Sequence, residues 1–122
     1  MEHEVALTNA DWRLMDLVWE YEPVESPELC RIAEGKLGWK RTTTYTVLKR
    51  LCEKGYLTNN ASVVTSQIAR QEAGKREGDQ VVNRGFKGSL PAFIAAFLEG
   101  GGISGEEAEQ IEQLLRDYRG KE

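Results

Sequence analysis

Residues 40–51 read Lys40-Arg41-Thr42-Thr43-Thr44-Tyr45-Thr46-Val47-Leu48-Lys49-Arg50-Leu51. On a helix, Val47, Leu48 and Leu51 fall on one side, and the Thr and basic residues spread over the rest. A helix built only for stability would rarely carry so many Thr, because β-branched side chains lose χ1 freedom there. A helix that lies in a DNA groove has a use for them, since hydroxyls and methyls meet base edges while Lys and Arg neutralise phosphates. The stretch therefore predicts a DNA-reading helix.

Positive charge is concentrated around this stretch. Between Gly38 and Gly55, five cations stand against one acid, Glu53, which gives a local charge of +4. The whole chain carries −4, so the remaining residues must sum to −8. A basic segment in an acidic chain fits a protein that presents one element to DNA, and it argues against a general nucleic-acid coat.

A second helix and a turn are predicted directly before the basic stretch. Ser26-Pro27-Glu28 is typical of a helix start, with Ser26 as the N-cap, proline at the first helical position and an acid in the first turn. Gly35 and Gly38 bracket the end of this short helix. Two short helices joined by a Gly-containing turn, the second polar and basic, form the helix-turn-helix arrangement.

A small β ribbon is predicted after the basic helix, which should end with Gly55 as a left-handed C-cap. Residues 56–58 and 62–65 read as strands, and Asn59-Asn60 reads as the turn between them because Asn tolerates a positive φ. A two-stranded ribbon that follows a recognition helix is a wing. This one is short and carries no Lys or Arg.

The N-terminal part should complete the core of this domain. Thr8 or Asn9 can cap a helix that has Asp11 in its first turn. The following residues are apolar nearly all round the helix, so we expect this helix to be largely enclosed.

From Gln67 on, the sequence reads as helices. Ser89 can cap one helix, and Ser104 with Glu107 fits a capping box for the last. The apolar side chains in this part are too many to be covered by so few residues, so we expect a homodimer. The residues expected in its interface are Phe86, Leu90, Phe93, Phe97, Ile111, Leu114 and Leu115.

The predicted fold class is mainly α with a small two-stranded β wing: a winged helix-turn-helix followed by a helical dimerisation region. The expected domains are residues 1–66, which bind DNA, and residues 67–122, which dimerise.

Three quoted stretches together resemble the penicillinase-repressor type of winged-helix regulators, the BlaI/MecI-like family. They are Leu7-Thr8-Asn9-Ala10-Asp11-Trp12, then residues 42–51 with Lys54-Gly55, then Gly88-Ser89-Leu90. The resemblance covers nearly the whole chain. It implies a dimeric repressor that binds a palindromic double-stranded DNA operator through an N-terminal winged helix and dimerises through C-terminal helices.

The resemblance also implies which residues touch DNA. Thr43, Thr46 and Arg50 match positions on the family's recognition helix. With their neighbours, the expected DNA-binding set is Lys40, Arg41, Thr42, Thr43, Tyr45, Thr46, Lys49 and Arg50. Thr44 and Val47 are expected to pack inward, and Lys54 is either part of the site or a solvated charge. Antibiotic-responsive members are cleaved between an Asn and a Phe; here Ala96 stands in place of that Asn before Phe97, which argues against the same cleavage.

Other classes of function find little support. The chain has two cysteines and one histidine, too few for a structural zinc site, and it lacks a phosphate loop or a nucleophile pair, so we expect no enzyme, metal or cofactor. No apolar run reaches the length of a membrane span and no signal pattern opens the chain, so a cytoplasmic protein is expected. The alternative kept open is a winged-helix module that binds protein partners and not DNA.

Overall fold

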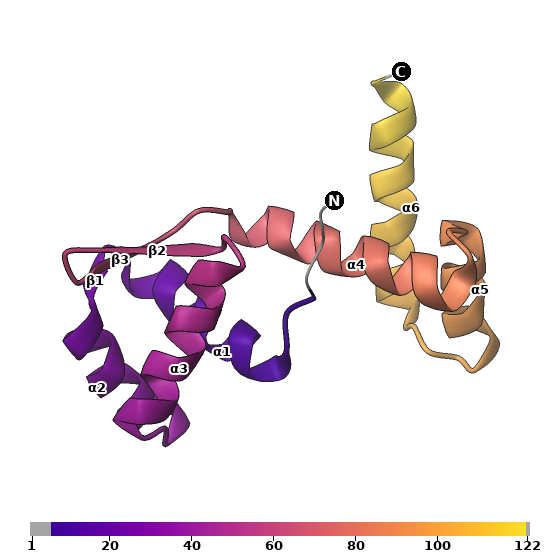
Figure 1. The fold of residues 1–122 in the computed structure, drawn as a ribbon. Helices are drawn as coiled ribbons and strands as arrows, with labels where there is room; N and C mark the ends of the chain where they lie inside the picture. The colour runs from indigo at the N-terminus through magenta and orange to yellow at the C-terminus, as the bar shows by residue number, and fades with distance from the viewer. Residues whose placement is uncertain (1–5, 122) are drawn as a thin grey trace. The chain divides into compact units, whose positions relative to one another are not determined.

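The computed structural model describes residues 6–121 (Figure 1). The elements are α1 (Asn9–Tyr21), β1 (Val24–Glu25), α2 (Ser26–Leu37), α3 (Arg41–Glu53), β2 (Leu57–Asn60), β3 (Val63–Ser66), α4 (Arg70–Phe86), α5 (Leu90–Glu99) and α6 (Gly105–Gly120). They make two compact units, which divide between Gly78 and Asp79, inside α4. The division of roles expected at residue 66 remains a prediction.

The first unit is a winged helix-turn-helix, as predicted. Helices α1, α2 and α3 pack around a shared apolar core that is closed by one face of the sheet (Figure 1). The fully enclosed side chains are contributed by every one of these elements: Leu14, Met15, Val18, Leu29, Ala33, Leu51 and Val64. The core therefore fixes α3 from behind and leaves its outer face to solvent.

The strands form, in the described part of the chain, a three-stranded antiparallel sheet in the order β1-β3-β2. Strand β1 was not predicted; it adds Val24 opposite Val64. The predicted turn at Asn59-Asn60 is wrong, because both residues lie in β2 and the positive φ angles belong to Ala61 and Ser62. The observed register pairs four residues of each strand, more than a turn at Asn59 would allow.

The helix ends follow the predicted signals closely. Thr8 caps α1 in a capping box, where its hydroxyl accepts from the Asp11 N–H and the Asp11 carboxylate accepts from the Thr8 N–H. For α2 the prediction is one residue off: Glu25 is the N-cap and Ser26 is already helical. Gly38, at φ +72°, ends α2 in the left-handed conformation.

Two glycines of the first unit should respond oppositely to alanine. A Cβ added at Gly74, inside α4, would meet nothing within 4 Å, so Gly74→Ala should raise the free energy of unfolding by about 1 kcal/mol through helix propensity. At Gly38 the space is equally open but the backbone is left-handed, so Gly38→Ala should lower it by about 1–2 kcal/mol. Urea unfolding of both variants measures the two shifts; equal effects would contradict the backbone argument.

The second unit, taken by itself, has no buried residue among those described from Asp79 on. The rings of Phe86, Phe93 and Phe97 stack edge to face, with centroids 5.3 and 5.0 Å apart. Ser89 caps α5, and Ser104 with Glu107 forms the predicted capping box of α6. Of the residues expected in a dimer interface, Leu90, Phe97, Leu114 and Leu115 are exposed, and Phe86, Phe93 and Ile111 are half-buried. Their apolar surface is not covered within the unit.

Candidate nucleic-acid interface

Helix α3 has one buried and one exposed side, as its sequence pattern predicted. Thr44, Val47, Leu48 and Leu51 are buried, which confirms the inward packing expected for the first two. The side away from the core carries exposed hydroxyls and a cation: Thr42, Thr43, Thr46 and Lys49. A polar helix face held rigidly by its opposite face is the geometry in which a helix reads a DNA groove.

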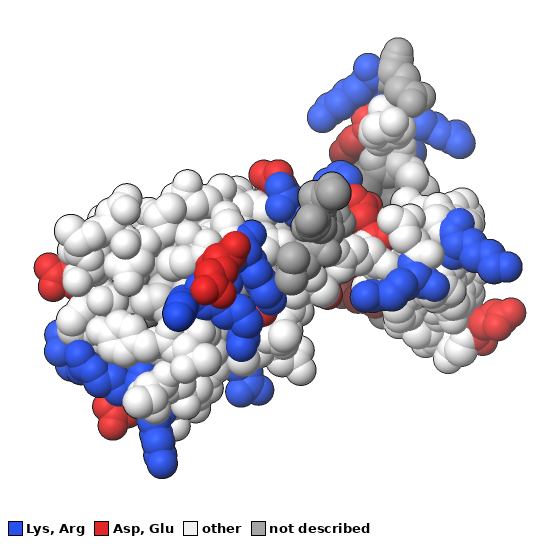
Figure 2. Space-filling model, viewed as in Figure 1, with Lys and Arg blue, Asp and Glu red and all other residues white. Residues whose placement is uncertain are grey.

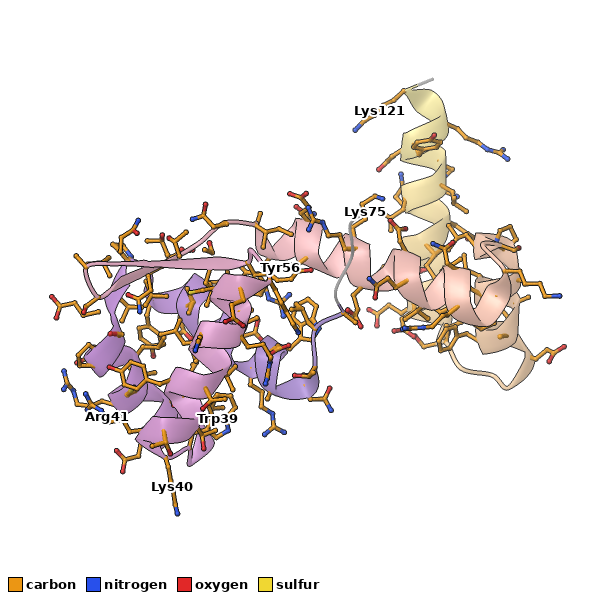
Figure 3. The ribbon with its side chains drawn as sticks, viewed as in Figure 1. Trp39, Lys40, Arg41, Tyr56, Lys75 and Lys121 are labelled. Carbon is orange, nitrogen blue, oxygen red and sulfur yellow. The ribbon has the colours of Figure 1, made fainter. Side chains whose placement is uncertain are left out.

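The N-terminal end of α3 is basic and open. Lys40 and Arg41 are exposed there and project outward (Figure 3), and Figure 2 shows Lys and Arg side chains gathered at this end of the first unit. Among the described residues, no side chain caps the first N–H groups of α3, and its first turn holds no acid. Free N–H groups, the helix dipole and two cations together favour a phosphate at this position.

Tyr45 and Thr46 are partly engaged within the unit. The Arg41 guanidinium lies 5.4 Å from the centre of the Tyr45 ring, a cation–π contact. The half-buried Tyr45 directs its hydroxyl toward α2, 3.5 Å from Ser26 Oγ. The Thr46 hydroxyl donates to the Thr42 carbonyl at 2.9 Å, which leaves its oxygen as an acceptor and its methyl group for contacts outside the helix.

Arg50 and Lys54 are held by a carboxylate from another helix. Asp11, fully buried near the start of α1, accepts from Arg50 Nε and Nη2 on Oδ1 at 3.1 and 2.7 Å, and from Lys54 Nζ on Oδ2 at 2.7 Å. Lys54 is only 12% exposed, so the interpretation of this residue as a solvated charge is wrong. Arg50 keeps 39% of its side chain exposed and thus belongs both to this buried cluster and to the surface.

Asp11 is ionised in this cluster. Burial pushes the pKa of the carboxyl up, but the hydrogen bonds from Lys54, from the Thr8 backbone and from Arg50 outweigh burial and leave the pKa below its ordinary value. Because the Asp11 carboxylate lies against Arg50 and Lys54, the charge of residues 38–55 together with Asp11 is +3 and not +4. The positive surface of α3 depends on Lys40, Arg41, Lys49 and the exposed part of Arg50.

Sequence reasoning missed the role of Asp11 beyond helix capping. Arg50 lies in α3 and Lys54, four positions on, is its C-cap residue, so the two side chains share a face and Asp11 meets both of them. The four-residue spacing of the two cations is visible in the sequence. The acid that binds them could not be identified from it, because Asp11 lies 39 residues from Arg50.

Other kinds of site are not found in the part of the chain that the structure describes. No group of three or more His, Cys, Asp or Glu side chains there is placed to hold a metal ion. Cys30 is buried, Cys52 is half-buried, and both are free thiols. No helix among the described residues is long and apolar enough to cross a membrane.

Comparisons with known proteins agree with this geometry. Residues 7–117 match the family model described as penicillinase repressor. The penicillinase repressor of Bacillus licheniformis is 24% identical over 119 residues, which cover 94% of this chain and 93% of that protein. The methicillin resistance regulatory protein MecI of Staphylococcus aureus is 20% identical over 113 residues, or 89% and 92% of the two chains. The solution structure of the DNA-binding domain of the repressor BlaI matches with a TM-score of 0.53 and 22% identity, over 59% of this chain and 93% of that one, which confirms the winged-helix fold.

Proposed function

This chain belongs to the penicillinase repressor family, and from that premise we propose that it is a sequence-specific transcriptional repressor that binds a palindromic DNA operator as a homodimer. The observation that carries the proposal is the outer face of α3, where hydroxyl and basic side chains are exposed on a helix anchored from behind. On this proposal the protein works in the cytoplasm, on double-stranded DNA, without a cofactor.

The side chains of α3 divide into two groups by chemistry. Thr43, Thr46 and Arg50 lie at i, i+3 and i+7 on one face, so we assign to them the contacts with base edges in the major groove. The flanking residues Lys40, Arg41, Thr42 and Lys49 would contact phosphates and fix the register of the helix. Tyr45, half-buried under Arg41, would support the phosphate contacts of that residue.

Dimerisation is proposed from the second unit. Its apolar side chains are not covered within the described part of that unit, and a second copy related by a two-fold axis would cover the same surface on both. The two recognition helices would then read half-sites about 34–36 Å apart, one turn of DNA.

Gel-shift titration with DNA from upstream of the chain's own gene tests the proposed function. We expect a retarded band at about 50 mM salt and competition by unlabelled operator but not by scrambled DNA of equal length. No retarded band with folded protein would support instead the protein-interaction module, which the acidic net charge and the uncharged wing favour.

Lys49→Ala should weaken binding to operator and scrambled DNA alike. A phosphate-contacting Lys contributes about one unit to the slope of log affinity against log salt, so two copies should lower it by about two. Lys121→Ala, which removes the same charge from the C-terminal end of α6 (Figure 3), is the matched control and should leave the slope unchanged. Equal slopes for the wild type and Lys49→Ala would remove Lys49 from the interface.

A further inference from the structure

We propose that Asp11 is a positioning residue for DNA recognition: its buried carboxylate fixes the Arg50 guanidinium in the orientation that reads the operator. The inference rests on the proposed function and deepens it by assigning specificity to a residue that DNA never touches. The cluster that carries it joins the start of α1 to the last turns of α3 and consists of Asp11, Arg50 and Lys54.

The geometry of the hydrogen bonds fixes the Arg50 side chain. Nε and Nη2 both donate to Asp11 Oδ1, which immobilises one edge of a planar guanidinium. The Asp11 carboxylate is itself immobile, because Oδ2 accepts from the Thr8 N–H at 3.0 Å and from Lys54 Nζ. Because Asp11 occupies the edge made by Nε and Nη2, a bidentate contact with a guanine or a phosphate is left to the edge made by Nη1 and Nη2, and fixing the first edge presets the direction of the second.

Charge balance shows that Arg50 is not needed merely to neutralise Asp11. Lys54, nearly enclosed and 2.7 Å from Oδ2, already supplies one positive charge to the buried carboxylate, and it also donates to the Ala6 carbonyl. Arg50 is a second cation on the same carboxylate and stays 39% exposed. A buried pair needs one cation, so the second leaves net positive charge at the surface of the predicted reading face.

The protonation state of Asp11 agrees with a permanent clamp. Its pKa lies below the ordinary value, since the donated hydrogen bonds outweigh the effect of burial. The carboxylate is therefore charged throughout the neutral range, and the orientation of Arg50 does not change there with pH.

The test compares affinities for operator and for scrambled DNA of equal length by fluorescence anisotropy at fixed salt. Asp11→Asn keeps the size of the side chain and removes one negative charge per copy, which raises the net charge of each copy by one. Electrostatics alone predicts tighter binding to both DNAs. Positioning predicts about 10-fold weaker operator binding, within the range that one base-reading arginine contributes, with scrambled DNA bound as well as or better than before.

Asp16→Asn is the matched control. Asp16 lies on the same helix and pairs with Arg70 at the surface, so its replacement makes the same change in charge without touching α3. The ratio of operator to scrambled affinity should stay at the wild-type value in Asp16→Asn and fall in Asp11→Asn. An unchanged ratio in Asp11→Asn overturns the proposal. This includes the case in which both affinities fall by the same factor, because such a loss signals only a smaller folded fraction.

Two further variants separate positioning from folding. In the background of Arg50→Gln, Asp11→Asn should cause no further loss of operator preference, since its target is gone; an additional loss overturns the proposal. Arg50→Lys keeps the charge and the buried carboxylate but cannot form the two-point grip, and it should lower the ratio about 10-fold even if Asp11→Asn does not fold. If the wild type shows no preference for operator, the proposed function fails and this inference falls with it.

Discussion

Operator binding should weaken by about 10³–10⁵-fold when the salt concentration rises from about 50 to about 200 mM. The expectation follows from counting the cations on the side of α3 that we propose faces DNA. Each copy offers Lys40, Arg41 and Lys49 to phosphates, while Arg50 is assigned to a base edge, so a dimer presents six. Six phosphate contacts lie at the lower end of the six to ten for which counterion release gives a loss of this size, with a slope of about −5.

Anisotropy titrations at several salt concentrations measure this slope. Because Lys54 is held by Asp11, it is not counted, and Lys54→Gln should leave the slope unchanged if the variant folds. A slope near −10 would mean that the wing or the second unit adds contacts. A complex whose affinity does not respond to salt would contradict a phosphate-based interface altogether.

Local signals in the sequence predicted the helices well because the groups that stabilise their ends lie within four residues of each other. The capping boxes of Thr8 with Asp11 and of Ser104 with Glu107 are examples, and both are present. The inward face of α3 was equally accessible, since Val47, Leu48 and Leu51 recur with the helical period.

Features set by distant residues were missed. Strand β1 is two residues long and exists because Val24 meets Val64, which the local sequence around Pro23 does not indicate. The turn was placed at Asn59-Asn60 from the local preference of Asn for positive φ. In the structure the position of the turn follows from strand pairing. The longer hairpin gains more paired residues and the hydrogen bond between the Thr58 and Thr65 hydroxyls, 3.0 Å apart.

In the candidate site, too, local features could be predicted and features set by distant residues could not. That α3 is basic, Thr-rich and exposed on one side could be predicted from residues 40–51 alone. That Lys54 is withdrawn from solvent and Arg50 is clamped could not, because both depend on a single carboxylate brought up by the packing of α1 against α3.

Leu114→Glu should dissociate the proposed dimer and lower operator affinity by about 10²–10⁴-fold, the advantage that two linked binding modules have over one. Leu114 is 68% exposed on α6, so the monomer loses little by its replacement, and Glu is a good helix former. In a dimer the same position would be buried, and two unpaired carboxylates facing each other across a two-fold axis are strongly unfavourable.

Sedimentation equilibrium and anisotropy with the same samples check the two halves of this prediction. The wild type should sediment at twice the 13.7 kDa mass of one chain and Leu114→Glu at that mass. Gln113→Glu introduces the same charge about 100° around α6 from Leu114, where Gln113 makes exposed hydrogen bonds with Arg116 and Asp117, and it should behave as the wild type. A Leu114→Glu protein that remains dimeric would place the interface elsewhere in the second unit. A monomeric Leu114→Glu protein that binds the operator with full affinity would show that pairing of the recognition helices does not contribute to operator affinity.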